Sequence, residues 1–262
     1  MKITNIQMDM AFANPKENFI KAEKLIREAT KNKPDVIVLP ETWNTGFFPH
    51  ENLSSLCDDN GKEVKEKIGA LAKELSVNIV AGSVANLKGE KVYNTCFVFN
   101  RNGECIAEYD KTHLFTPMNE DDYFQKGENL VKFELDGVPC AVIICYDIRF
   151  PELTRTLTLK GVDVFFVVSQ WPKIRIPHLL ALTKARAIEN QMFLSCCNSC
   201  GTAGETVYGG NSVMFDPWGE CLAKAEGEEC MITAEFDLSV VEGIRKSINV
   251  FNDRRPGLYK IN

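Results

Sequence analysis

The chain has 262 residues, of which 45% are hydrophobic and 25% charged, the balance of an ordinary globular protein. This excludes a disordered chain, and the length is sufficient to bury a core without disulfides or a structural metal. Thirty basic side chains against 36 acidic ones give a net charge of −6, which disfavours nucleic acid or an anionic membrane as a partner. Asp9 lies where a signal peptide has its apolar core, and no apolar run is long enough to cross a membrane. We therefore expect a cytoplasmic protein.

Helices and apolar strands alternate in the first half of the chain. Asn14-Pro15 is typical of a helix start, and Asn100-Arg101-Asn102-Gly103 is typical of a hairpin turn. The stretch 116–129 is polar and has no clear period. The expected elements are, in order, a helix from Asn14 to Ala29, a strand over 36–39, a helix over 61–75, a strand over 78–84, and a hairpin of strands 92–99 and 104–109.

The second half repeats this pattern and ends in a polar tail from Ile248, which we expect to be an arm without regular structure. Asp136-Gly137 is a strong hairpin dipeptide. The expected elements are a hairpin of strands 130–135 and 138–145, a helix over 151–160, a strand over 163–169, a helix over 177–190, a strand over 192–198, a hairpin of strands 212–215 and 220–225, a strand over 229–236 and a helix near 238–246.

This order of elements indicates an α/β fold. Helices alternate with strands toward the ends of each half, hairpins lie between them, and no linker rich in Gly, Ser or Pro interrupts the chain. We predict a four-layer α-β-β-α sandwich of two mixed sheets with outer helices, formed as a single domain over residues 1–262. A doubly wound sheet would explain half of the same pattern.

The ten cysteines are the unusual feature of the composition. In a cytoplasmic chain we expect free thiols, most of them buried as small apolar side chains. The run Cys196-Cys197-Asn198-Ser199-Cys200 has no second ligand pair at zinc-finger spacing, and the three histidines are isolated. We therefore expect neither a metal nor another cofactor, and the question is which cysteine does chemistry.

Three side chains of complementary chemistry come at the ends of predicted core strands, where α/β proteins gather their ligands. Glu41 and Lys111 follow two such strands, and Cys145 ends a third. Glu120 lies in the aperiodic stretch between them. Taken singly, a Glu or Lys at a strand end is usually solvated, and a Cys after an apolar run is usually a packing residue. Their common location favours a shared site.

These residue types can together carry out acyl transfer without a histidine. A thiol is a strong nucleophile only as the thiolate, so Cys145 needs a base. The Glu41 carboxylate could take its proton, and the Lys111 ammonium could hold that carboxylate and face a developing oxyanion. Backbone N–H groups just after the cysteine could share the oxyanion.

Three motifs resemble the carbon–nitrogen hydrolase (nitrilase) superfamily: VIVLPETWNTGF around Glu41, EYDKTHLF around Lys111 and GVPCAVIICYDIRFPEL around Cys145. Their order and approximate spacing match the family, and segments such as NIVAGSV and GGNSVMFDPWGE extend the resemblance over nearly the whole chain. The resemblance implies the same four-layer sandwich, assembled as a homodimer or a larger homo-oligomer.

The resemblance also implies a role for each residue. Cys145 is the nucleophile, Glu41 the general base and Lys111 the electrostatic stabiliser, while Glu120 orients Lys111 or the reacting water. The backbone amide of Tyr146 is a second oxyanion donor. The thiolate would attack an amide carbon, ammonia would leave, and a water activated by the base would hydrolyse the thioester.

Within the superfamily, the short chain and the phrase ETWNTGF resemble the ω-amidase branch, which deaminates 2-oxoglutaramate and 2-oxosuccinamate. A substrate with a remote carboxylate needs a cation besides Lys111, and Arg149 and Arg175 are candidates. Arg149 could instead be structural and hold the turn after Cys145. Candidates for the pocket wall are side chains that ordinary core packing would explain equally well: Phe47, Trp171, Met118 and Phe150.

Two other functions remain open from the sequence. The first is hydrolysis of another amide by the same superfamily, namely an N-carbamoyl compound or a short aliphatic amide. The second belongs to a different class, a non-catalytic redox or metal-handling thiol protein. That protein would have several thiols of similar reactivity, whereas the amidase would have one dominant reactive thiol.

Overall fold

The computed structural model describes residues 1–47 and 49–259. The strands of one sheet are β1 (Lys2–Gln7), β2 (Val36–Val38), β3 (Asp58–Asp59), β4 (Asn78–Lys88), β5 (Lys91–Phe99), β6 (Cys105–Asp110) and β15 (Cys230–Glu235). Their order is β15-β1-β2-β4-β5-β6, with β3 beside β4. The sheet is mixed, because β1, β2 and β4 run parallel while β15, β5 and β6 are antiparallel to their neighbours.

The second sheet repeats this plan. Its strands are β7 (Lys132–Leu135), β8 (Val138–Ile144), β9 (Val164–Ser169), β10 (Phe193–Asn198), β13 (Val213–Phe215) and β14 (Cys221–Lys224). Their order is β14-β13-β10-β9-β8-β7, with β8, β9 and β10 parallel at the centre. The two sheets face one another, and β1 contacts β10 while β4 contacts β9.

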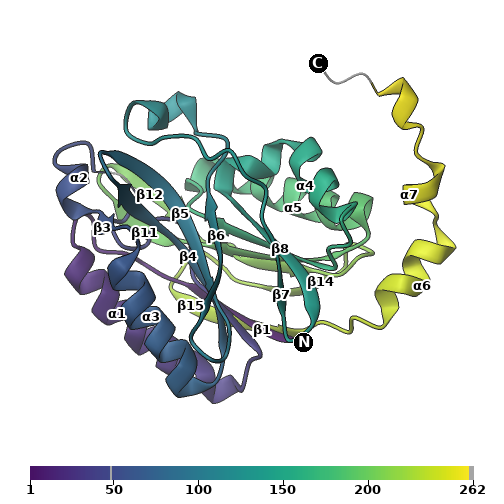
Figure 1. Ribbon diagram of the computed structural model, residues 1–262, viewed down its shortest axis with the longest axis horizontal. Helices are drawn as coiled ribbons and strands as arrows, with labels where there is room; N and C mark the ends of the chain where they lie inside the picture. Colours follow the sequence, from purple (N-terminus) through teal and green to yellow (C-terminus); the bar gives the residue numbers. More distant parts are fainter. Residues whose placement is uncertain (48, 260–262) are drawn as a thin grey trace.

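Helices cover the outer face of each sheet (Figure 1). The first sheet is covered by α1 (Pro15–Ala29) and α3 (Lys62–Leu75), and the second by α4 (Pro151–Thr158) and α5 (Ile176–Asn190). The α-β-β-α sandwich expected from the sequence is therefore confirmed, and most predicted elements are found within two residues of their expected ends; β4 runs four residues longer. No helix in the described part of the chain is long and apolar enough to cross a membrane.

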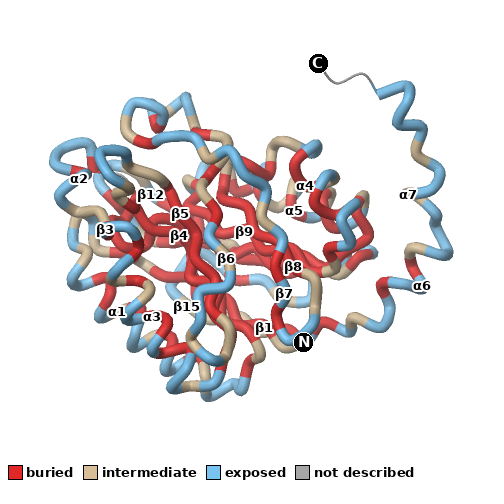
Figure 2. Tube along the Cα trace, in the orientation of Figure 1, coloured by how far each residue is buried: buried red, intermediate tan, exposed pale blue. Residues whose placement is uncertain are grey.

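The strand β2 explains why the core strands read as unbroken apolar runs. Val36 and Val38 pack into the core between the sheets, whereas Ile37 points to the opposite face and packs with the helices α1 and α3. A strand covered on both faces has no polar side, so it lacks the alternation of a half-exposed strand. The tube coloured by burial shows the same layering, with buried residues concentrated in the central strands (Figure 2).

Three regions differ from the sequence-based expectation. The strand β1 was not predicted, because Thr4, Asn5 and Gln7 interrupt its apolar pattern. These polar residues are nevertheless buried, and Asn5 is hydrogen-bonded across the sheets to the Cys196 carbonyl and the Ser195 hydroxyl. The unpredicted short hairpin β11 (Cys200–Ala203) and β12 (Thr206–Gly209) lies beside the site described below.

The C-terminal expectation was wrong in part. After α6 (Val240–Ser247), the tail forms a short helix α7 (Val250–Asp253) and a 3-10 turn over Pro256–Leu258, instead of an arm without regular structure. Figure 1 shows α6 and α7 running along one side of the molecule, away from the end where α2 (Leu53–Leu56) lies. Polar residues alone therefore did not exclude local helical turns here.

Candidate active site

Four chemically reactive side chains meet at one end of the sandwich, where strands of both sheets terminate. Glu41 follows β2, Lys111 follows β6 directly, and Cys145 follows β8 directly. Glu120 begins a 3-10 turn, Glu120–Asp122, in the stretch that has no period in the sequence. All four are buried. The side chains that the sequence placed at separate strand ends are thus neighbours in the fold.

The Lys111 ammonium is the centre of this cluster. It donates hydrogen bonds to Glu41 Oε1 at 2.8 Å and to the two carboxylate oxygens of Glu120 at 2.9 and 2.8 Å. Glu120 Oε2 also accepts the backbone N–H of Phe115, so that carboxylate is held from two sides. The three charged groups form a buried ion triad, in which one cation serves two anions.

Cys145 lies on a tight turn from β8 into a 3-10 helix, Cys145–Arg149. Its φ of +51° is in the left-handed region, which a non-glycine residue adopts at a cost of about 1–3 kcal/mol. Such a turn raises the side chain above the end of the strand, as at other strand-to-helix nucleophiles. It also puts the Tyr146 amide in the first turn of the helix, where N–H groups have no partner within the helix.

Only one of the two carboxyl oxygens of Glu41 takes part in the triad. Its Oε1 accepts hydrogen bonds from Lys111 and Asn94, whereas its Oε2 is buried without a hydrogen-bond partner among the described residues. The Cys145 thiol lies close enough to this carboxyl for each group to shift the pKa of the other. Glu41 therefore has one oxygen held by cationic and amide donors and one oxygen available to exchange a proton.

Burial and charge set the protonation states of the cluster. Burial raises the pKa of Glu41, since it outweighs the effect of the adjacent Lys111. Burial, followed by the negative charge of Glu41, raises the pKa of Cys145 well above its usual value. Burial alone would lower the pKa of Lys111, but the charges of Glu120 and Glu41 hold it well above its usual value. At rest these directions favour a neutral Cys145 thiol and a permanently charged Lys111 ammonium.

Asn94 is a contributor that the sequence reasoning did not single out. It lies on β5, is fully buried, and donates to Glu41 Oε1 at 2.9 Å and to Glu120 Oε1 at 3.4 Å. The backbone carbonyl of Asn94 also accepts the backbone N–H of Lys111 at 2.9 Å. Asn94 therefore ties the two carboxylates and the lysine to one strand. In the sequence it is a polar residue within VYNTCFVFN, a segment that also resembles the family and lies in the expected strand 92–99.

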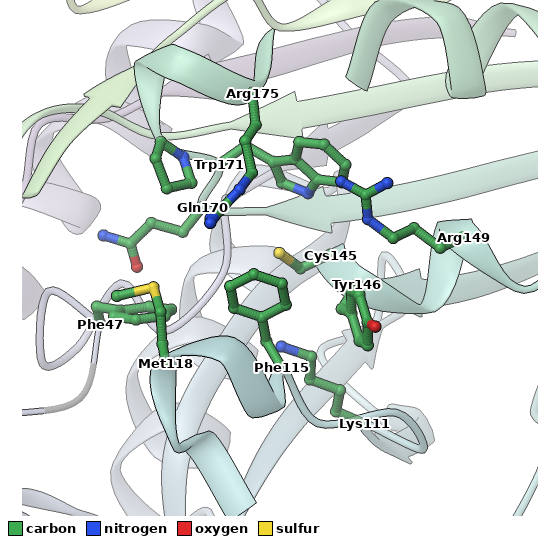
Figure 3. A pocket seen from close by; sticks show the side chains of 11 residues that line it. Phe47, Lys111, Phe115, Met118, Cys145, Tyr146, Arg149, Gln170, Trp171 and Arg175 are labelled. Atoms are coloured by element: carbon green, nitrogen blue, oxygen red, sulfur yellow. The ribbon is translucent and has the colours of Figure 1, made fainter. Parts of the chain in front are cut away.

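Lys111 and Cys145 connect the cluster to a pocket that is open to solvent. Figure 3 shows the Cys145 sulfur among the lining side chains, with the Lys111 ammonium below it and Trp171 and Arg175 above it. The lining includes all the residues proposed from the sequence as substrate contacts or pocket walls except Phe150. It adds Phe115, Gln170 and Pro172, which were not proposed. It consists of Phe47, Lys111, Phe115, Met118, Cys145, Tyr146, Arg149, Gln170, Trp171, Pro172 and Arg175. Phe150 is not part of it.

Two arginines line the pocket without a carboxylate partner. The Arg149 guanidinium lies 4.8 Å from the Trp171 ring centroid, and that of Arg175 lies 4.8 Å from the Phe115 centroid. Within residues 1–47 and 49–259, neither forms a salt bridge. The structural role considered for Arg149 stays a prediction: its guanidinium forms a 3.4 Å hydrogen bond with His178 Nδ1. Arg186 also contacts the turn after Cys145 and donates to the Ile148 carbonyl at 3.1 Å.

The end of β9 adds hydrogen-bond donors to the pocket. Gln170 accepts a hydrogen bond from the Thr42 hydroxyl at 2.9 Å, which fixes the orientation of its side-chain amide. The other end of that amide, Nε2, and the indole N–H of Trp171 are buried without partners among the described residues. Unsatisfied buried donors are rare in folded proteins, so both are available to a ligand.

The other cysteines do not share this setting. All ten are free, and five besides Cys145 are buried: Cys96, Cys140, Cys196, Cys197 and Cys200. Burial raises the pKa of the Cys196 and Cys200 thiols to about 12, and it raises that of Cys145 as well. Cys145 differs because the carboxyl of Glu41 and the ammonium of Lys111 lie beside it. Across the described residues, no group of His, Cys, Asp and Glu side chains is arranged to hold a metal ion.

The family model for carbon–nitrogen hydrolases matches residues 2–246. The chain belongs to this family. Among curated proteins, it is 44% identical to the 2-oxoglutaramate amidase of Bacillus subtilis, over 98% of each chain. It is also 31% identical to the omega-amidase NIT2 of Xenopus tropicalis, over 94% of this chain and 92% of that protein.

Solved structures of the family have the same fold. The structure of Saccharomyces cerevisiae Nit3, a member of branch 10 of the nitrilase superfamily, superposes with a TM-score of 0.85 at 26% identity. The match covers 97% of this chain and 96% of Nit3. As a carbon–nitrogen hydrolase, the protein is an enzyme that cleaves amide C–N bonds.

Proposed function

We propose that the protein hydrolyses the terminal amide of a small 2-oxo acid, 2-oxoglutaramate or 2-oxosuccinamate, to the acid and ammonia. The observation that carries this proposal is the burial of a thiol, a carboxyl and an ammonium together beside a pocket that also contains two guanidinium groups, neither of which forms a salt bridge within the described residues. The first three groups serve the reaction, and the last two serve the substrate carboxylate.

The first half of the reaction forms a thioester. Glu41 takes the proton of the Cys145 thiol through its unpartnered Oε2, and the sulfur attacks the amide carbon. The Lys111 ammonium and the Tyr146 backbone N–H stabilise the negative charge that develops on the carbonyl oxygen. The C–N bond then breaks, the proton held by Glu41 passes to the departing nitrogen, and ammonia leaves.

The second half returns the enzyme to its starting state. Glu41 removes a proton from a water molecule that attacks the thioester carbon. The C–S bond breaks, the acid is released, and the proton returns to the sulfur. Glu120 keeps the ammonium in place throughout, because both of its oxygens accept hydrogen bonds from Lys111. No cofactor takes part in either half.

The substrate class is supported by the pocket and by the named relatives. Arg149 and Arg175 line the same pocket as Cys145 and can bind the carboxylate of an amide substrate there. Phe47 and Trp171 form apolar walls on its sides. The 44% identity to an enzyme named for 2-oxoglutaramate favours the same substrate here.

The test is ammonia release from a panel of amides, with Cys145→Ala as the blank. We expect the highest kcat/KM with 2-oxoglutaramate, and much lower values with N-carbamoyl-β-alanine and with a neutral aliphatic amide. Faster turnover of N-carbamoyl-β-alanine would assign the enzyme to that substrate instead, since it also carries a carboxylate. No ammonia from any amide in the panel would contradict the proposed function.

The proposal also covers the location, the domain organisation and the assembly of the enzyme. We place it in the cytoplasm as one hydrolase domain over residues 1–262, acting as a homodimer or a larger homo-oligomer. The match of the family model to residues 2–246 supports the single domain, and the resemblance to the superfamily supports the oligomer. Light scattering on the purified protein gives its mass, and a monomer at micromolar concentration would contradict this part of the proposal.

A further inference from the structure

Asp147 is a fully buried carboxylate two residues after Cys145, and the reaction described above does not use it. It accepts five hydrogen bonds. Its Oδ2 accepts the Ile144 backbone N–H at 3.0 Å and the Tyr109 hydroxyl at 2.7 Å. Its Oδ1 accepts the Thr112 hydroxyl at 3.0 Å, the His113 backbone N–H at 2.9 Å and His113 Nδ1 at 2.8 Å.

These donors belong to two separate parts of the active site. Ile144 is the residue immediately before Cys145, so its N–H sets the strained turn that carries the sulfur. Tyr109, Thr112 and His113 flank Lys111 on both sides in the sequence. One carboxylate therefore joins the strand end that carries the nucleophile to the strand end that carries the ammonium, across the two sheets.

This link between the two strand ends requires a side chain that accepts hydrogen bonds on both of its terminal atoms. Each oxygen of Asp147 accepts one backbone N–H, from Ile144 on one side and from His113 on the other. An asparagine in this position would have to point its NH₂ group at one of these two N–H donors, whichever way its amide is turned. The isosteric amide thus loses at least one backbone hydrogen bond and leaves a buried donor unpaired.

We propose that Asp147 is a positioning residue that fixes the Cys145 turn relative to Lys111, with Tyr109, Thr112 and His113 as the donors through which it acts. The proposal rests on the assigned roles of Cys145 and Lys111. A displacement of about 1 Å between reacting groups can lower a rate about 100-fold without a change in substrate binding. Loss of the Asp147 hydrogen bonds should therefore lower kcat more than it changes KM.

The first variant to test is Asp147→Asn, for which we expect kcat to fall by about 100-fold while KM stays within about two-fold. Because the residue is buried, this variant could fail to fold, so a double variant, Tyr109→Phe with Thr112→Val, is made in parallel. It removes both side-chain hydroxyls from Asp147 and keeps both backbone donors. For the double variant we expect about a 10-fold loss of kcat with KM unchanged.

Thr158→Val is the matched control. It removes a buried hydroxyl that donates to the Thr154 carbonyl at 2.7 Å and to Met192 Sδ at 3.5 Å. In the described part of the chain, this hydroxyl has no hydrogen bond to Asp147 or to its donors. We expect its kcat to equal that of the wild type, even where its melting temperature falls as far as that of the double variant. A loss of kcat in the control as large as in the double variant would make the effect one of general stability and overturn the proposal.

The rate of Cys145 alkylation by iodoacetamide, followed by peptide mapping, gives a second readout that needs no substrate. We expect it to fall in parallel with kcat in the Asp147 and Tyr109/Thr112 variants, since the thiol moves away from its base. A folded double variant with wild-type kcat and wild-type alkylation would overturn the proposal. If the wild type turns over no amide, the proposed function fails, but the alkylation rates still decide whether Asp147 positions Cys145.

Discussion

Lys111 donates to Glu41 through only one of the two carboxylate oxygens, Oε1, at 2.8 Å, and leaves Oε2 without a partner in the described part of the chain. The ion pair therefore fixes the orientation of the Glu41 carboxylate and leaves its Oε2 available to accept a proton. With Glu120 on the same ammonium, the buried triad has two negative charges against one positive charge whenever both carboxyls are ionised. This imbalance makes Glu41 the costly member of the cluster and Lys111 the member that the other two need.

Replacing Glu41 by Gln is therefore expected to abolish turnover and to stabilise the protein. The amide oxygen of the variant can keep the hydrogen bonds from Lys111 and Asn94, while its NH₂ group takes the unpartnered position of Oε2. The remaining Lys111–Glu120 pair is electrically neutral. We expect kcat to fall at least about 1000-fold, and the free energy of unfolding in urea to rise. A less stable E41Q protein would show that the triad stabilises the fold.

The stability difference between E41Q and the wild type depends on pH in a definite direction. Burial raises the pKa of Glu41 above its ordinary value of 4.5, so the folded state binds this proton more tightly than the unfolded state does. The resulting stability is present below pH 4.5 and is lost as the pH rises through the raised pKa. The advantage of E41Q should thus be largest above the raised pKa of Glu41 and shrink on acidification. An advantage that grows toward acid pH would contradict this sign.

Lys111→Met should have the opposite effect on stability. The variant leaves Glu41 and Glu120 as two buried carboxyls without their cation. Removal of one partner from a buried charge pair costs about 3–5 kcal/mol. We expect a large fall in the free energy of unfolding together with complete loss of turnover, and E41Q is the matched control with the same cluster. Unfolding measured by urea titration with both variants side by side tests this order.

The two pocket arginines should contribute to binding of anionic substrates and not to the chemistry. Hydrogen bonds to a charged group contribute about 1.5–3 kcal/mol, so Arg175→Met and Arg149→Met should each raise KM for 2-oxoglutaramate by about 10-fold to 100-fold. Their turnover of a neutral aliphatic amide should stay near that of the wild type. Equal losses with the charged and neutral amides would mean that these side chains shape the pocket without binding the carboxylate.

In thiol labelling, protection by a bound ligand should distinguish Cys145 from the exposed cysteines more clearly than the rate of alkylation alone. Cys105 and Cys221 are exposed, so an alkylating reagent reaches them directly. Cys145 lines the pocket, so the product 2-oxoglutarate should slow its alkylation and leave the labelling of Cys105 and Cys221 unchanged. Peptide mapping after iodoacetamide, with and without the product, measures this. Protection of all three thiols to the same extent would indicate an effect unrelated to the pocket.

The sequence by itself determined the order of helices and strands, and it placed Glu41, Lys111 and Cys145 at strand ends. Both follow from local patterns, because apolar runs and turn residues act over a few positions, and the motifs around these residues are short. It failed at β1, whose buried Thr4, Asn5 and Gln7 look exposed until their partners on the other sheet are known. Burial of polar groups depends on partners that are distant in the chain.

Only the tertiary structure decided how the side chains meet. Glu41 and Lys111 are 70 residues apart in sequence, and Asn94 and Asp147 acquire their positions from contacts between strands that no local pattern describes. Packing of two sheets brings their strand ends together. Among residues 1–47 and 49–259, this determines which oxygen of Glu41 has no hydrogen-bond partner and which arginines form no salt bridge. The identity of the reacting groups is local, whereas their mutual geometry arises from the packing of the sheets.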